Sequence, residues 1–329
     1  KVVVRLTPSK STPPEPDGEV TSPIMTAPQL QFSTVTTGAT APASGRRKSG
    51  LSHDADGAPV RLAHERARRS GRLEDPFGGW TATLAITLVS LFLRLWQLGT
   101  PHSFEFDETY YAKDSWSLWH FGYARDYIDN DGGVANRHIL AGQTTGLWKP
   151  DASMVVHPEV GKWMIAFGEG VFGLNPFGWR FSSAFIGTLM ILVMCRLVRR
   201  LTGSTLLGCV AGLLLGFDGL HFVMSRFALL DIFLAFWLLC AAHCLIADRD
   251  WARLKLAKRH ETTPKRSRWS FGPVRGFLFR PWRITAGVCF GLACGTKWSG
   301  VYVMAGFLLV MWSWDAGMRR AAGVRWSGL

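Results

Sequence analysis

Two adjacent carboxylates, Asp107 and Glu108, follow Phe106 shortly after the first long apolar segment of the chain. A carboxylate can act as a general base that removes the proton of a hydroxyl group while the hydroxyl oxygen attacks an electrophilic carbon. One such base is enough for an inverting displacement when the leaving group is an activated phosphate. We expect the two side chains to have different catalytic roles, because neighbouring residues on a helix point about 100° apart. The alternative is that both carboxylates only favour the positive N-terminal end of a helix.

A second polar group, His157, Glu159 and Lys162, precedes another apolar stretch. We predict that these side chains contact an acceptor or shape the loop that contains them. A phosphate partner would explain a lysine in this otherwise acidic region. The alternative is that Lys162 extends to lipid headgroups and that Pro158 only begins a helix.

Five ionisable residues lie near the ends of the later apolar segments, namely Arg180, Asp218, Arg226, Asp231 and Lys297. An ionised side chain at membrane depth costs about 2.5 to 3.5 kcal/mol on insertion scales, so these residues are expected to be functional. We predict that Arg180, Arg226 and Lys297 bind the phosphate of a donor, and that Asp231 contacts the acceptor or shapes a loop. The alternative is internal pairing, for instance of Arg226 with Asp231 or Asp218.

Apolar segments of membrane-spanning length must position these residues. A helix needs roughly 20 apolar residues to cross the hydrocarbon core. The sequence predicts spans at 80–98, 181–197, 206–222 and 229–247, and two further spans within 284–314 that turn at Lys297 to Gly300. We therefore predict an all-α integral membrane protein, with a transmembrane domain of about six spans over residues 80–329. Residues 1–79 are poor in large apolar side chains and are predicted to form a disordered tail.

The distribution of charge predicts the orientation. Basic clusters lie in the tail, at 196–200, at 249–283 and at 319–325, and six spans place all of them on one side, which is the cytoplasmic side by the positive-inside rule. Residues 99–178 are acidic by about two to one and are predicted to be an external loop. Within this loop, 107–123 has aromatic residues at helical spacing, which favours an amphipathic helix at the membrane interface. We predict a multi-pass protein of the cell membrane with its N-terminus in the cytoplasm and its active site outside.

The remaining composition excludes other classes of function. The formal charge of +13 lies in clusters that flank apolar segments, so nucleic acid is not an expected partner. The six cysteines and the histidines lack metal-ligand spacing, and no glycine-rich nucleotide loop is present. If the group transferred to the hydroxyl is a sugar, its donor would therefore have to arrive attached to a lipid. No cofactor is required by the motif, although a divalent ion that bridges Asp107 or Glu108 to the donor stays open.

Five motifs occur in the order seen in protein O-mannosyltransferases: Phe106–Glu108, His157–Lys162, Arg180 in Gly-Trp-Arg-Phe, Ser225–Asp231 and Lys297–Gly300. The chain resembles the actinobacterial members of that family from about Phe77 to about Trp314. The resemblance implies a glycosyltransferase C-type helical bundle that transfers mannose, with inversion, from a polyprenyl phosphate to Ser or Thr of secreted proteins. It also implies that Asp107 is the base, that Glu108 positions the acceptor or the base, and that Arg180 supports the site or meets the donor.

Two departures from the family pattern affect what we expect. Glu159 stands where the family more often has proline, and this difference affects the expected shape of the loop or its contacts with the acceptor. The family also continues with further spans, so we expect the chain to be truncated at its C-terminus. One alternative function is a related transferase that acts on a lipid or cell-wall glycan, and another is a transporter or structural subunit without enzymatic activity. The expected partners are a lipid-linked mannose and secreted proteins, and contact with the secretion translocon stays open.

Overall fold

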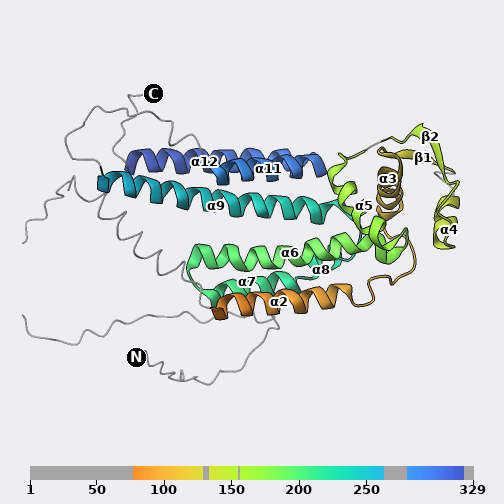
Figure 1. Cartoon of the computed structure of the whole chain (residues 1–329), viewed down its shortest axis with the longest axis horizontal. Coiled ribbons are helices and arrows are strands. Elements are labelled where there is room, and N and C mark those ends of the chain that lie inside the picture. The colour runs from red at the N-terminus through yellow and green to blue at the C-terminus, as the bar shows by residue number, and fades with distance from the viewer. Residues whose placement is uncertain (1–76, 129–132, 155, 263–279, 322–329) are drawn as a thin grey trace, which may run out of the picture. The chain divides into compact units, whose positions relative to one another are not determined.

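In the part of the chain that the structure describes, six helices run side by side at the positions where the sequence predicts spans (Figure 1). They are α2 (Phe77–Leu95), α6 (Pro176–Thr202), α7 (Thr205–Phe217), α9 (Leu230–Thr262), α11 (Pro281–Thr296) and α12 (Gly300–Ala321). The computed structural model describes residues 77–128, 133–154, 156–262 and 280–321. The predicted tail at 1–79 lies outside the described residues except for its last three, which already belong to α2.

Four of these helices are long and apolar enough to cross a membrane, namely α2, α6, α9 and α12. Helix α7 has 13 residues and α11 has 16. The prediction of one continuous span over 206–222 is wrong, because α7 ends at Phe217 and a separate short helix, α8 (Gly219–Met224), follows. The break occurs at Asp218, whose carboxylate accepts a hydrogen bond of 2.7 Å from the backbone N–H of His221 and caps α8.

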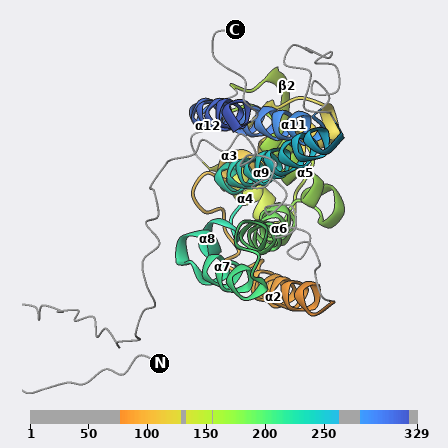
Figure 2. The same ribbon diagram turned by 90° about the vertical axis from the view of Figure 1, so that its left-hand side faces the viewer.

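The bundle consists of two groups of helices that meet where α6 packs against α9 (Figure 2). In one group α6 packs against α2 and α7, and in the other α9 packs against α11 and α12. The main apolar core lies where α5, α6 and the first turns of α9 come together, and it contains Ile165, Trp179, Leu230 and Phe233. The cysteines are free thiols that are buried or partly buried, as the sequence predicts.

The predicted loop 99–178 contains its own short elements, which gather at one end of the bundle (Figure 1). They are α3 (Glu108–Phe121), β1 (Arg125–Tyr127), α4 (Val134–Leu140), β2 (Trp148–Ala152) and α5 (Val160–Phe172). Strands β1 and β2 pair antiparallel, with Arg125 opposite Ala152 and Tyr127 opposite Trp148. The predicted helix at 107–123 is confirmed as α3. We call this end of the bundle, which also contains residues 218–229 and 297–299, the loop end.

Helix α5 is held against its neighbours at positions where only glycine fits. A Cβ atom on Gly168 would lie 2.5 Å from the backbone oxygen of Gly178 in α6. A Cβ atom on Gly170 would lie 2.4 Å from the ring of Trp119 in α3. These close approaches fix the distance of α5 from α3 and α6, and therefore the position of the residues that begin α5.

We expect Gly168→Ala to lower the free energy of unfolding by about 1 to 3 kcal/mol, because the added methyl group meets backbone that cannot move aside. Gly287→Ala is the matched control, since Gly287 is an exposed helical position with no atom within 4 Å of the added Cβ. Helix propensity predicts that this control is neutral or stabilising by up to about 1 kcal/mol. Thermal unfolding of the two variants in detergent measures the difference, and equal stabilities would contradict the close packing of α5.

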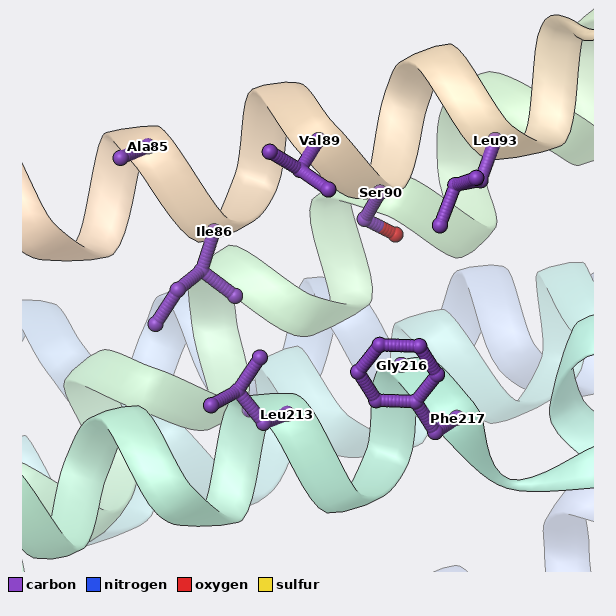
Figure 3. Close-up of a pocket in the computed structure, with 9 residues that line it drawn as sticks. Ala85, Ile86, Val89, Ser90, Leu93, Leu213, Gly216 and Phe217 are labelled. Carbon is purple, nitrogen blue, oxygen red and sulfur yellow. The ribbon is translucent and has the colours of Figure 1, made fainter.

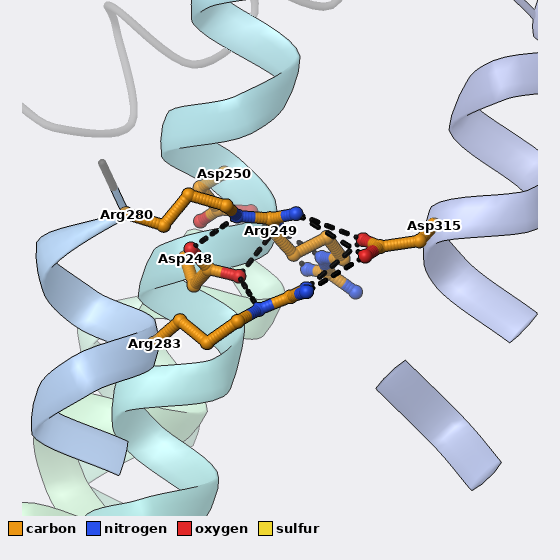
Figure 4. Close-up of polar contacts among 6 residues, drawn as sticks. All are labelled: Asp248, Arg249, Asp250, Arg280, Arg283 and Asp315. Atoms are coloured by element: carbon orange, nitrogen blue, oxygen red, sulfur yellow. Dashed lines mark hydrogen bonds and ion pairs between the residues drawn. The ribbon is translucent and has the colours of Figure 1, made fainter. Parts of the chain in front are cut away.

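The opposite end of the bundle is held by an ion-pair network between α9, α11 and α12 (Figure 4). Arg280 donates to Asp248 at 2.8 Å and to Asp315 at 3.0 Å, and Arg283 donates to Asp248 at 3.2 Å and to Asp315 at 2.7 Å. Asp248 and Arg280 are buried. Part of the positive charge that the sequence places at this end is therefore paired, and the pairs fix the relative position of three helices. We call this end the basic end.

Candidate active site

Asp107 stands on the surface of the loop end, at the position that precedes the first turn of α3. Phe106 before it has a φ of +50°, a left-handed conformation that is uncommon for an aromatic residue and is typical of functional sites. The hydroxyl group of Tyr111, one turn later, donates a hydrogen bond of 3.3 Å to Oδ2 of Asp107. The carboxylate is thus oriented by its own helix and remains accessible to a substrate.

Glu108, in contrast, is fully buried. Its Oε1 accepts hydrogen bonds from Arg180 Nε at 2.9 Å and from the backbone N–H of Ala228 at 2.8 Å. Its Oε2 accepts from Arg180 Nη2 at 2.8 Å and from the backbone N–H of Glu105 at 3.1 Å. The two adjacent carboxylates therefore have different environments, as the helix geometry predicts. Burial and these four contacts fit the predicted role of Glu108 as a residue that positions the base.

Arg180 is the buried partner of Glu108, and its guanidinium group is fully used by the protein. Two N–H groups form the bidentate contact with the carboxylate. The other three donate to the backbone carbonyls of Leu98 at 3.3 Å, Pro101 at 2.9 Å and Ser103 at 2.9 Å. No N–H group of Arg180 is left for a donor phosphate, so the predicted phosphate contact does not agree with this geometry. Arg180 instead ties the segment that leads to Asp107 onto α6.

Lys297 and Asp231 form an accessible ion pair at the loop end. Lys297 ends α11, Asp231 lies in the first turn of α9, and their Nζ and Oδ1 atoms are 2.8 Å apart. The side chain of Lys297 is 25% exposed and that of Asp231 is 46% exposed, so a ligand can reach both. The pairing is internal, as the alternative interpretation of the sequence allowed, but Asp231 pairs with Lys297 rather than with Arg226.

His157 lies within electrostatic range of these groups and of Asp107. Partial burial lowers the pKa of His157, as do Lys297 and Lys162, while Asp231 and Asp107 oppose the shift. The rings of His157 and Tyr111 lie 6.3 Å apart. Burial, Asp107 and Asp231 together raise the pKa of Tyr111. The fold thus brings together residues from α3, the α5 approach, α9 and α11. We call Asp107, Tyr111, His157, Asp231 and Lys297 the Asp107 cluster.

Lys162 lies within electrostatic range of His157 and is 1% exposed. Its Nζ is 2.9 Å from Oδ2 of Asp114 in α3 and 3.7 Å from Oε1 of Glu159. Neither a lipid headgroup nor a phosphate is needed to explain this lysine, because Asp114 is its counter-ion. Lys162 and Glu159 therefore fit the predicted loop-shaping role, in which they hold the start of α5 against α3.

Arg226 and Asp218, also singled out in the sequence, are not paired with each other in any described contact. Arg226 donates to the backbone carbonyls of Leu93 at 3.1 Å and Gln97 at 3.2 Å, where α2 ends. These contacts direct it toward α2 and not toward the Asp107 cluster. Its role as a ligand of the donor phosphate stays a prediction that the described contacts do not favour.

Several buried polar residues were missed by sequence reasoning. Arg94 is fully buried and donates to Ser225 Oγ at 2.9 Å and to Nδ1 of His221 at 3.0 Å. Asp114 is seven residues after Asp107, and this helical spacing was the signal that could have linked it to the site. Among the residues that the structure describes, no group of three His, Cys, Asp or Glu side chains is arranged to hold a metal ion.

Glu169 was also missed; it is fully buried in α5, and neither of its carboxylate oxygens has a hydrogen-bond partner among the described residues. Burial, with a smaller contribution from Asp114, raises its pKa well above 4.5. The folded protein holds the carboxyl proton of Glu169 more tightly than the unfolded chain does, so stability decreases as pH rises from 4.5 toward the raised pKa.

We expect Glu169→Gln, which mimics the protonated acid, to raise the melting temperature by a few degrees near pH 7.5. This gain should vanish near pH 4.5, and melting curves across this pH range check it; a gain independent of pH would contradict the assignment.

Comparison with known proteins identifies the family. The family model described as dolichyl-phosphate-mannose-protein mannosyltransferase matches residues 84–320. A polyprenol-phosphate-mannose–protein mannosyltransferase of Mycolicibacterium smegmatis (strain MKD8) is 39% identical over 257 residues, which cover 76% of this chain and 45% of the relative. The protein of the same description from Mycobacterium tuberculosis (strain CDC 1551 / Oshkosh) is 40% identical over 267 residues, which cover 77% of this chain and 45% of the relative. The chain thus spans about half the length of the curated relatives that it matches.

Among solved structures, the chain is similar to the Saccharomyces cerevisiae protein O-mannosyltransferase Pmt1-Pmt2 complex bound to the sugar donor. The TM-score is 0.51 at 16% identity, over 80% of this chain and 34% of that one, which supports the fold class. The predicted glycosyltransferase C-type helical bundle is therefore confirmed. With the family model matched over most of the described residues, the chain belongs to the dolichyl-phosphate-mannose-protein mannosyltransferase family.

Proposed function

We propose that this chain transfers mannose from polyprenyl-phosphate-mannose to serine and threonine hydroxyl groups of secreted or membrane proteins, with inversion at the anomeric carbon. The observation that carries the proposal is the accessible carboxylate of Asp107, oriented by Tyr111 and placed within electrostatic range of His157. Asp107 can serve as a base, and Lys297 and His157 can contact a phosphate. All three lie at the loop end of a membrane bundle, which supports the proposal. The lipid-linked donor and the protein acceptor correspond to the names of the relatives.

The reaction follows from the Asp107 cluster. Asp107 accepts the proton of the acceptor hydroxyl while its oxygen forms a bond to the anomeric carbon, and the bond from that carbon to the phosphate oxygen breaks. The electron pair leaves with the phosphate, and the proton stays on Asp107 until solvent removes it. Lys297 stabilises the departing negative charge, and His157, which its surroundings keep neutral at pH 7, donates a hydrogen bond. Glu108 and Arg180 hold the backbone on which Asp107 is placed.

The acceptor is tested directly with the complete protein in proteoliposomes that contain radiolabelled polyprenyl-phosphate-mannose. A peptide rich in serine and threonine is offered together with a lipid-linked glycan, and a peptide with alanine at every serine and threonine is the control. We expect label in the first peptide and none in the control. Label confined to the glycan would overturn the protein acceptor and favour a transferase that acts on glycans. Contact with the secretion translocon is a further proposal, which crosslinking during secretion would test.

We also propose that the loop end faces the exterior of the cell membrane and that the basic end faces the cytoplasm. The acidic balance of 99–178 and the arginines near Asp248 support this orientation. In a cysteine-free background, Asp151→Cys on exposed β2 should react with a membrane-impermeant maleimide in intact cells. Lys255→Cys in α9, also exposed, should react only after the cells are permeabilised. The reverse pattern would contradict both the orientation and an external active site.

A further inference from the structure

An apolar groove with a cavity volume of about 200 Å³ lies between α2 and α7 (Figure 3). Val89 and Leu93 of α2 form one wall, and Leu213 and Phe217 of α7 form the other. All four side chains are exposed, and α2 is one of the helices long enough to span the membrane. The groove therefore opens toward the hydrocarbon region and suits an alkyl chain.

Two arginines stand where this groove reaches the loop end. Arg94 is buried and donates to the backbone carbonyls of Ser90 at 3.4 Å and Gly216 at 3.5 Å, and both of these residues line the groove. Its other described hydrogen-bond partners, the hydroxyl groups of Ser90 and Ser225 and the His221 ring, are also uncharged acceptors. The guanidinium group is thus hydrogen-bonded, but its charge is not neutralised by any of these contacts.

Arg226 is partly exposed beside the same end of the groove. Its Nη1 donates to the carbonyl of Leu93, a residue of the groove wall, and its Nη2 donates to the carbonyl of Gln97. Each of these nitrogens has a second N–H group and Nε has one more, so three donors remain for a ligand. No carboxylate in the described part of the chain forms an ion pair with Arg94 or Arg226. The positive charge beside the groove therefore calls for an anion from outside the protein.

We propose that the α2–α7 groove and Arg226 bind a bilayer phospholipid, with one acyl chain between the helices and the phosphate on the guanidinium group. The buried charge of Arg94 adds positive potential beneath the phosphate. In return, the negative phosphate offsets the free-energy cost of burying the Arg94 guanidinium group. A phosphate suits the free N–H groups of Arg226 because the planar guanidinium binds it in a bidentate way. The site is separate from the Asp107 cluster and does not depend on the transfer reaction.

The dimensions favour a bilayer lipid over the polyprenyl donor as the occupant. The groove extends from Ala85 to Leu93, which at 1.5 Å per helical residue is about 12 Å. This is close to the half-thickness of the hydrocarbon core, about 15 Å, and it lies in the half of α2 nearest the loop end. An acyl chain of one leaflet fills such a length. The polyprenyl donor, in contrast, must present its sugar to Asp107, and the groove is separate from the Asp107 cluster.

The test measures lipid bound to the complete protein after purification from nanodiscs that contain palmitoyl-oleoyl phosphatidylglycerol in phosphatidylcholine. Native mass spectrometry counts the phosphatidylglycerol retained by each variant. Arg226→Gln removes the phosphate contact, and Val89→Trp fills the groove without changing charge. Lys149→Gln, an exposed cation on β2, and Leu88→Trp, an exposed α2 position outside the groove, are the matched controls. Melting curves establish that every variant is folded.

We expect Arg226→Gln and Val89→Trp each to lower phosphatidylglycerol retention by about tenfold, as the loss of a charge-assisted contact predicts, while both controls retain it. Unchanged retention in Arg226→Gln and Val89→Trp would overturn the site. Displacement of the phosphatidylglycerol by an equimolar amount of undecaprenyl phosphate would overturn the bilayer lipid as its occupant and assign the groove to the carrier. Both results are independent of mannose transfer, so they are distinguishable from failure of the proposed function.

Discussion

Replacement of Asp107 by asparagine in the complete protein lowers the rate of mannose transfer by about 10²- to 10⁴-fold, the usual contribution of a general base. Asparagine has nearly the same shape and still offers an oxygen to the hydroxyl group of Tyr111, so the local structure is retained. It cannot accept the proton of the acceptor hydroxyl at neutral pH. The loss should therefore appear in kcat, with little change in the KM for the donor.

The measurement is the initial rate of transfer to a serine- and threonine-containing peptide in proteoliposomes. Asp151→Asn is the matched control, because Asp151 is an exposed carboxylate on the same end of the bundle that lies outside the Asp107 cluster. We expect this control to keep the rate of the unaltered protein. Full activity of the Asp107→Asn variant would show that Asp107 is not the base. No other accessible carboxylate has a comparable position on α3, so the proposed reaction would then have no base there.

The second large effect concerns stability. Arg180→Met is expected to lower the free energy of unfolding by about 3 to 5 kcal/mol, because it leaves the buried carboxylate of Glu108 without its counter-ion. The variant also removes the donors that hold three backbone carbonyls of the segment leading to Asp107. Unfolding in denaturant, followed by tryptophan fluorescence in detergent, measures this change.

Lys149→Met tests the same kind of pair at the surface. The Lys149–Asp126 ion pair is 3.0 Å long but exposed, so its loss should cost only about 0 to 1 kcal/mol. Combining Arg180→Met with Glu108→Leu should recover part of the stability, since no uncompensated charge then remains. Equal costs for Arg180→Met and Lys149→Met would contradict the positioning role that we give to Glu108 and Arg180.

The structure of the loop end explains why the two adjacent carboxylates have different environments. Asp107 precedes α3 and stays exposed, whereas Glu108 begins the helix and points into the contact with α6 and residue 228. A base must reach its substrate, and a buried acid saturated with four N–H donors cannot do so. In the reaction that we propose, Asp107 is therefore the reacting group and Glu108 is the anchor that positions it.

The sequence alone determined most of the architecture. Apolar runs and their basic flanks predicted helices at the positions of α2, α6, α9, α11 and α12, because hydropathy and helical period are local properties. The aromatic spacing in 107–123 predicted α3 for the same reason. The exception was the span at 206–222, where the apolar composition continues but the side chain of Asp218 caps a new helix.

The tertiary structure decided which charged residues are paired inside the protein and which stay accessible. Arg180 and Glu108 are 72 residues apart, and Lys297 and Asp231 are 66 apart, so no local pattern could pair them. From the sequence both Arg180 and Lys297 were plausible phosphate ligands. Glu108 and the backbone carbonyls of residues 98, 101 and 103 use every N–H group of Arg180, while the ends of α11 and α9 leave Lys297 accessible. The physical reason is that hydropathy fixes where a helix forms, whereas the partner of a charge depends on which helices come into contact.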